Sequence, residues 1–206
     1  MDYGLGNLRA FQNIYARLNF HVKIATSPKI IQEAKVLILP GVGSFDWAIN
    51  KLNSSGLRAA LEDKVIDHQT PFLGVCVGMQ LLADSSEEGV MRGLGWIPGK
   101  VKKFSTKNQI TESTHDLILP HMGWNTVKLC QPSSLYGEED KDPQKYYFLH
   151  SYYFEPSSPD HALATTDYGA PFASVVGKKN VYGVQFHPEK SHRWGIGLLK
   201  KFAEIC

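Results

Sequence analysis

Strand-like apolar runs alternate with helix-patterned segments through the first half of this 206-residue chain. Apolar residues recur at helical spacing over 8–18, and a buried strand is expected at 36–39. Helices are expected at 45–52 and 57–68, and a second short strand at 72–75. This alternation is typical of βαβ units, in which helices cover both faces of a parallel sheet. We therefore expect an α/β fold with a central, mostly parallel sheet.

The second half of the chain shows strands in succession, with turn residues between them. Strands are expected at 101–104, 127–130, 146–154, 162–165, 172–176 and 181–186. We expect antiparallel additions to the sheet there, followed by an amphipathic helix at 195–205. The polar stretches 105–116 and 131–145 are expected to be surface loops rather than linkers, so we expect one domain over 1–206.

Composition excludes several classes of protein. With 43% hydrophobic and 20% charged residues, the chain is expected to be globular and not disordered. A net charge of +2 gives no basic footprint for nucleic acid or an anionic membrane. Three widely spaced cysteines argue against a disulfide framework, and no membrane span or export leader is expected. We therefore expect a cytoplasmic protein.

Two glycine loops fail the tests for nucleotide binding. The Gly-Leu-Gly at 4–6 has Arg9 where a dinucleotide fingerprint needs glycine. The Gly-Val-Gly at 41–43 lacks the Gly-Lys-Ser/Thr of a phosphate-binding loop. We predict no cofactor. The strand at 36–39 is expected to stop at Pro40, where the proline and the glycines at 41 and 43 break the ladder and expose backbone N–H groups.

The segment Gly-Val-Cys-Val-Gly at 74–78 lies between an apolar strand and a helical pattern. This is the nucleophile-elbow arrangement G-x-S-x-G with sulfur in place of oxygen. We expect Cys76 on a strained turn with its tip exposed above the sheet, where a helix N-terminus favours the thiolate. The alternative is a buried, inert cysteine, which is our interpretation of Cys130 and Cys206 unless they lie at the surface.

A partner for the thiolate is expected at the end of the strand 181–186. The sequence continues His187-Pro188-Glu189, and strand alternation would place the histidine and the glutamate on the same side. The carboxylate could then hold one imidazole nitrogen while the other faces sulfur. A metal site that adds His192 to these groups is an alternative, but no C-x-x-C or H-E-x-x-H occurs, and we predict no metal. A surface His-Pro turn is the structural alternative.

These motifs resemble a known family. The segments 40–43, 74–80 and 185–191 together resemble the class I (triad) glutamine amidotransferases. More narrowly, Pro-His-Met-Gly-Trp-Asn at 120–125 and His-Ser-Tyr at 150–152 look like the glutaminase subunits of imidazole glycerol phosphate synthases. The resemblance runs from about Asp2 to the C-terminus and implies a flavodoxin-like fold. That family begins with an apolar strand before the Asp-Tyr-Gly segment, so we expect most of that strand to be missing here.

The resemblance implies hydrolysis of L-glutamine to glutamate and ammonia through a thioester at Cys76. His187 would protonate the departing ammonia and then activate water, with Glu189 orienting the imidazole. The family's oxyanion donors correspond to the N–H of Val77 and an N–H from the loop of Val42 and Gly43. Its substrate contacts correspond to Gly41, Gln80, Ser151 and Tyr152.

The resemblance also implies a protein partner. Ammonia made for synthesis must be passed on through a closed route. In the family, the acceptor is a (β/α)8-barrel cyclase subunit, which forms imidazole glycerol phosphate and AICAR in histidine biosynthesis. Met122, Trp124 and Lys190 match family positions at that heterodimer interface.

Three alternatives remain open at this point. The chain could be a paralogous glutaminase that supplies ammonia for another acceptor, such as a surface sugar. It could be a stand-alone cysteine hydrolase acting on γ-glutamyl peptides. It could also be a catalytically silent binding module, which intact Cys76, His187 and Glu189 argue against.

Overall fold

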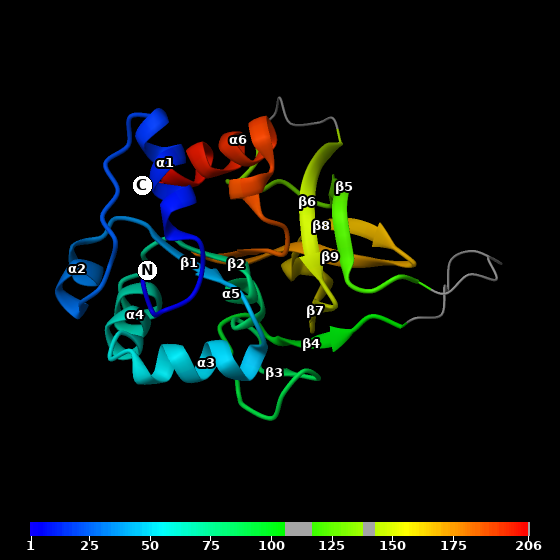
Figure 1. Ribbon diagram of the computed structural model, residues 1–206, viewed down its shortest axis with the longest axis horizontal. Helices are drawn as coiled ribbons and strands as arrows, with labels where there is room; N and C mark the ends of the chain where they lie inside the picture. Colours follow the sequence, from blue (N-terminus) through cyan, green and yellow to red (C-terminus); the bar gives the residue numbers. More distant parts are fainter. Residues whose placement is uncertain (106–116, 138–142, 206) are drawn as a thin grey trace.

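The computed structural model describes residues 1–105, 117–137 and 143–205 (Figure 1). In this part of the chain the strands form a ten-stranded sheet, with the main order β1-β2-β10-β9-β7-β4-β3 and with β8, β5 and β6 attached beside β9. Its strands are β1 (Leu37–Gly41), β2 (Phe72–Cys76), β3 (Ser85–Ser86), β4 (Gly99–Lys103), β5 (His121–Leu129), β6 (Gln144–His150), β7 (Tyr152–Pro156), β8 (Ala162–Tyr168), β9 (Ala170–Lys178) and β10 (Val181–Val184).

Helices cover both faces of the part of the sheet that holds β1 and β2. Figure 1 shows α1 and α6 on one side of these strands and α3 and α4 on the other. The helices are α1 (Leu8–Arg17), α2 (Pro28–Glu33), α3 (Phe45–Ser54), α4 (Arg58–Glu62), α5 (Val77–Gln80) and α6 (His192–Ala203), with a π-helical turn η1 (Asp63–Asp67) after α4 and 3₁₀ turns η3 (Pro159–His161) and η4 (Pro188–Lys190). Phenylalanines from both halves of the chain are fully buried between these layers, among them Phe45, Phe72, Phe154 and Phe202.

The expected division between parallel and antiparallel pairing is present. β2 pairs parallel with β1 on one side and with β10 on the other, whereas β9 pairs antiparallel with β10, β8 and β7. The strand predicted at 146–154 is in fact two strands, β6 and β7, which are separated at Ser151. β6 pairs with β5, whereas β7 pairs with β4. The strand predicted at 127–130 begins earlier, at His121. The predicted loops 105–116 and 131–145 are described only in part, since residues 106–116 and 138–142 lie outside the described residues.

Pro40 does not end the first strand as expected. β1 continues to Gly41, with Pro40 opposite Val75 of β2. β1 is the terminal strand of the main sheet order, so a residue on its outer edge needs no N–H for a ladder bond. On that edge the Met1 amino group donates to the Ile38 carbonyl at 2.8 Å.

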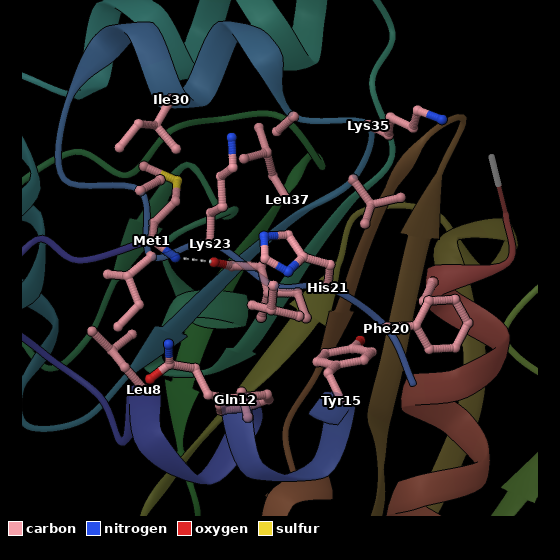
Figure 2. Close-up of a pocket in the computed structure, with 18 of the residues that line it drawn as sticks. Met1, Leu8, Gln12, Tyr15, Phe20, His21, Lys23, Ile30, Lys35 and Leu37 are labelled. Carbon is pink, nitrogen blue, oxygen red and sulfur yellow. Dashed lines mark hydrogen bonds between the residues drawn. The ribbon is translucent and has the colours of Figure 1, made fainter. Parts of the chain in front are cut away.

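A mostly apolar groove of about 410 Å³ runs along this edge, between β1, α1 and the extended segment 20–25 (Figure 2). Leu8, Tyr15, Phe20 and Leu37 are among the side chains that line it. Its lining does not include the motif residues Cys76, His187 and Glu189.

Among the described residues, no helix is both long and apolar enough to cross a membrane.

Candidate active site

Cys76 lies at the junction of β2 and α5, as the elbow motif predicts. Its backbone has φ 57° and ψ −114°, a conformation that is strained for a residue with a side chain. The turn is crowded: a Cβ at Gly78 would lie 2.0 Å from the Leu39 carbonyl oxygen, and one at Gly41 would lie 2.4 Å from the Gly78 nitrogen. Glycines at these positions therefore let the ends of β1 and β2 and the start of α5 meet backbone against backbone.

The thiol is buried rather than exposed. Cys76 is 5% exposed, and the side-chain amide of Gln185 lies over it, with Nε2 3.9 Å from Sγ. Gln185 follows β10, the parallel neighbour of β2, so the two chain ends meet at the same edge of the sheet. Burial, and to a smaller extent the charge of Cys76, raise the pKa of Tyr3 above its ordinary value. The expectation of an exposed tip was wrong because residues from neighbouring elements cover the elbow.

His187 and Glu189 form a buried pair beside Cys76. His187 Nδ1 lies 2.8 Å from Glu189 Oε1, with side chains 6% and 5% exposed. We expected strand alternation to bring them together, and that expectation was wrong. β10 ends at Val184, and residues Pro188–Lys190 form a 3₁₀ turn. The turn carries the carboxylate back to the imidazole.

The imidazole of His187 is held in its charged form. Burial alone would lower the pKa of His187, but hydrogen bonds with Cys76 and Glu189 and the charges of both groups outweigh it and raise that pKa to about 10. At neutral pH the sulfur therefore faces an imidazolium, which can donate a proton to a leaving group.

Backbone contacts with β6 fix the position of His187. The His187 N–H donates to the Tyr147 carbonyl at 2.8 Å. Ser191 Oγ completes the connection, since it donates to the His187 carbonyl at 2.6 Å and accepts from the Tyr147 N–H at 3.0 Å. Sequence reasoning missed this contribution, because the partners are main-chain atoms of a strand forty residues away.

The predicted oxyanion donors lie at the same edge. Val77 is the first residue of α5, so its N–H has no partner within that helix. Gly41 is the register partner of Cys76, and the chain then passes through Val42, 44% exposed, and the exposed Gly43 to α3.

The predicted substrate contacts are hydrogen-bonded within the protein. Gln80 Nε2 donates to the Tyr152 carbonyl and to Gln185 Oε1, both at 3.1 Å. The Ser151 carbonyl accepts from the Phe104 N–H at 3.2 Å. Gln185 contacts both Gln80 and Cys76, and sequence reasoning missed this role. Its amide side chain, at the end of an otherwise apolar strand, could have indicated it.

The predicted interface residues gather on one face of the hairpin formed by β5 and β6. In its antiparallel register, Met122 is opposite Leu149 and Trp124 is opposite Tyr147. Met122 is 65% exposed and Trp124 47%. Trp124 stacks on His192 with ring centroids 5.3 Å apart, and Lys190 Nζ lies 5.6 Å from the Tyr147 ring centroid. We call Met122, Trp124, Tyr147 and Leu149 the outer face of the hairpin.

Cys130 is exposed, which is the surface alternative for that cysteine, and Cys206 lies outside the described residues. His192, the fourth group of the metal alternative, lies against Trp124 of the hairpin.

Comparisons with known proteins agree with this geometry. The family model described as "Glutamine amidotransferase class-I" matches residues 1–205. "Imidazole glycerol phosphate synthase subunit HisH" of Bdellovibrio bacteriovorus is 49% identical, over 100% of this chain and 98% of the relative. The HisH subunit of Leptospira borgpetersenii is 46% identical, with the same coverage.

Solved structures support the fold. A crystal structure of a glutamine amidotransferase superposes with a TM-score of 0.69 at 18% identity, covering 97% of this chain and 94% of that one. The glutaminase domain of Trypanosoma brucei CTPS gives a TM-score of 0.63 at 16% identity, covering 96% of this chain and 86% of that one. The chain belongs to the class-I glutamine amidotransferase family, and within it to the HisH subunits of imidazole glycerol phosphate synthase.

Proposed function

We propose that this chain is the glutaminase subunit of an imidazole glycerol phosphate synthase. It hydrolyses L-glutamine to L-glutamate and ammonia, and the ammonia serves the formation of imidazole glycerol phosphate and AICAR in histidine biosynthesis. The observation that carries the proposal is the buried pair of His187 and Glu189, with Nδ1 2.8 Å from Oε1, at the sheet edge where the buried Cys76 lies. The full-length identity with HisH subunits favours this reaction over a stand-alone γ-glutamyl hydrolase or a silent module.

The reaction has two halves at Cys76. The thiolate attacks the γ-carboxamide carbon, and the carbonyl oxygen takes up negative charge beside the N–H of Val77 and the loop at Val42 and Gly43. The C–N bond then breaks as the His187 imidazolium protonates the leaving nitrogen, which releases ammonia and leaves a thioester. Neutral His187 next takes a proton from water, the hydroxide adds to the thioester carbon, and glutamate leaves as the thiolate re-forms.

A closed site accounts for the need for a partner. Because Cys76 and the His187 side chain are almost completely buried, glutamine reaches the sulfur only when the covering residues move. We assign that movement to docking of a (β/α)8-barrel cyclase on the outer face of the hairpin, with Lys190 as its charged contact. Exposed apolar anchors beside a single cation suit such an interface. The cytoplasm, where histidine is made, is the expected compartment.

Glutamine hydrolysis measured with and without the cyclase tests this function. We expect hydrolysis to increase when the cyclase is added. Replacement Cys76→Ala is expected to reduce it by about 10³-fold or more, because the nucleophile is lost. Cyclase binding should be unchanged in this variant, since Cys76 is buried away from the surface. Cys130→Ala, at an exposed thiol, is the matched control and should keep full activity.

Retention of glutaminase activity by Cys76→Ala would overturn the proposal. Full-rate hydrolysis of γ-glutamyl peptides by the isolated chain would instead favour a stand-alone hydrolase. Failure of the cyclase to bind, with ammonia passed to another synthetic enzyme, would favour a paralogue.

A further inference from the structure

Two histidines are in direct contact on the inner side of the β5–β6 hairpin. His121 of β5 and His150 of β6 are opposite each other in the register, 3% and 6% exposed, with His121 Nδ1 2.9 Å from His150 Nε2. The His121 ring is stacked between Phe148 and Tyr168, with centroids 4.8 Å and 4.0 Å away. None of the steps derived for glutamine hydrolysis uses either imidazole.

Hydrogen bonding fixes the tautomer of both rings. His150 Nδ1 lies 2.8 Å from the Tyr152 carbonyl, which can only accept, so Nδ1 carries the proton and Nε2 accepts. His121 Nδ1 must then be the donor in the pair, which leaves His121 Nε2 as an acceptor. Asn125 Nδ2 supplies that acceptor with a donor at 3.2 Å, and gives its other hydrogen to the Asp167 carbonyl at 2.9 Å. Both rings are neutral in this arrangement, and burial lowers the pKa of each, to about 4 for His121 and about 3 for His150.

The series of hydrogen bonds continues from the hairpin to the nucleophile. The Tyr152 carbonyl that accepts from His150 also accepts from Gln80 Nε2. The same Gln80 amide donates to Gln185 Oε1, and Gln185 Nε2 faces Cys76 Sγ. The Tyr152 carbonyl therefore accepts from both His150 and Gln80, so loss of the His150 donor removes one of the two hydrogen bonds that fix this carbonyl.

The hairpin presents its two faces to different surroundings. Side chains alternate along β5, so Met122 and Trp124 point to the outer face and His121 and Asn125 to the inner one. Leu149 and His150 divide in the same way on β6. A partner docked on the outer face would therefore contact the same two strands that hold the histidine pair.

We propose that His121 and His150 are positioning residues, which hold the Tyr152 carbonyl and, through Gln80, the Gln185 amide in place beside Cys76 and so connect docking on the hairpin with the nucleophile. This role rests on the proposed glutaminase function. It adds to that function two groups that touch neither the glutamine nor the reacting atoms.

Two substitutions at one position separate hydrogen bonding from packing. His121→Phe keeps a stacked ring but loses the donor to His150. His121→Asn keeps a donor near the place of Nδ1 but loses the ring.

In the complex with the cyclase we expect His121→Phe to reduce kcat for glutamine hydrolysis about tenfold, with KM changed less than about twofold. We expect His121→Asn to recover at least half of that loss on a logarithmic scale. Tyr168→Phe keeps its ring on His121 and, among the described residues, loses its bond to the Ile118 carbonyl, so it should leave kcat unchanged.

The readouts keep this proposal distinct from the glutaminase proposal. A glutamine-analogue electrophile should still label Cys76 in His121→Phe, because the nucleophile and His187 are intact; absence of labelling in the unaltered chain would count against the function itself. A kcat for His121→Phe equal to that of the unaltered chain would overturn the positioning role. So would a pattern in which His121→Asn is the more damaged variant and kcat follows thermal stability, since packing alone accounts for that result.

If His121→Phe does not fold, Asn125→Leu provides the test at a more exposed position. The substitution removes the donor to His121 Nε2 without adding a charge, so the tautomer in which His121 Nδ1 donates to His150 is no longer fixed. We expect a reduction of kcat with cyclase binding unchanged. An unchanged kcat in that variant would contradict the proposal.

Discussion

At the scale of single residues, the candidate site depends on atoms that approach closer than most side chains allow. Cys76 takes a backbone conformation that is unusual for a non-glycine residue, and it does so because Gly78 lets α5 begin against the end of β1. The elbow was predictable from sequence, since two glycines spaced around a cysteine after an apolar strand are typical of a sharp strand-to-helix turn. The cover over the sulfur was not, because Gln185 is placed by the pairing of β10 with β2.

Replacement Gly78→Ala tests the close approach at the elbow. Its Cβ would lie 2.0 Å from a backbone oxygen, which cannot rotate away. We expect the free energy of unfolding to fall by about 2–4 kcal/mol, measured by urea denaturation. Gly197→Ala in α6 is the matched control, since no atom of the described residues lies within 4 Å of a Cβ placed there; it should stabilise the chain by about 0.5–1 kcal/mol. Equal effects of the two substitutions would show that the approach is not tight.

At the scale of elements, the β5–β6 hairpin joins a surface to a site. Its exposed side chains form the outer face, its buried side chains include the histidine pair, and its backbone accepts the N–H of His187. The sequence motif at 120–125 indicated a surface role for Met122 and Trp124. It did not indicate the inner face, because the pairing of β5 with β6 spans residues that no short motif connects.

Acid should weaken the packing of this hairpin. The pKa values of His121 and His150 in the fold, about 4 and about 3, lie below the ordinary value of 6.5. Between about 6.5 and 4 the unfolded chain binds protons that the folded chain does not, so the free energy of unfolding should decrease as pH falls through this range. His187 opposes this slope near 6.5, where the unfolded chain is only partly protonated at that residue, and contributes little at lower pH, where it is protonated in both states.

Denaturation midpoints at several pH values measure this effect. The His121→Phe variant removes one of the two groups, so its stability should depend less steeply on pH than that of the unaltered chain. Parallel curves for the two proteins would contradict the assignment of neutral, buried imidazoles.

At the scale of the whole molecule, the α/β class followed from the alternation of the first half, and the class-I glutamine amidotransferase family confirms it. The places where expectation failed have a common physical cause. Pro40 remains in a strand because β1 is terminal in the main sheet order, and Glu189 reaches His187 through a 3₁₀ turn in place of strand alternation. Both outcomes depend on which segments lie next to Pro40 and Glu189 in the fold, and the local sequence around these residues does not predict those neighbours.

The most direct test of the central claim is to stop glutamine turnover by acid in the complex with the cyclase and to locate the covalent intermediate by mass spectrometry. A thioester mechanism predicts a glutamyl group on the peptide that contains Cys76, none on the peptide that contains Cys130, and loss of the adduct in Cys76→Ala. Continued turnover with the glutamyl group on another residue, or ammonia release that survives loss of the Cys76 thiol, would contradict it.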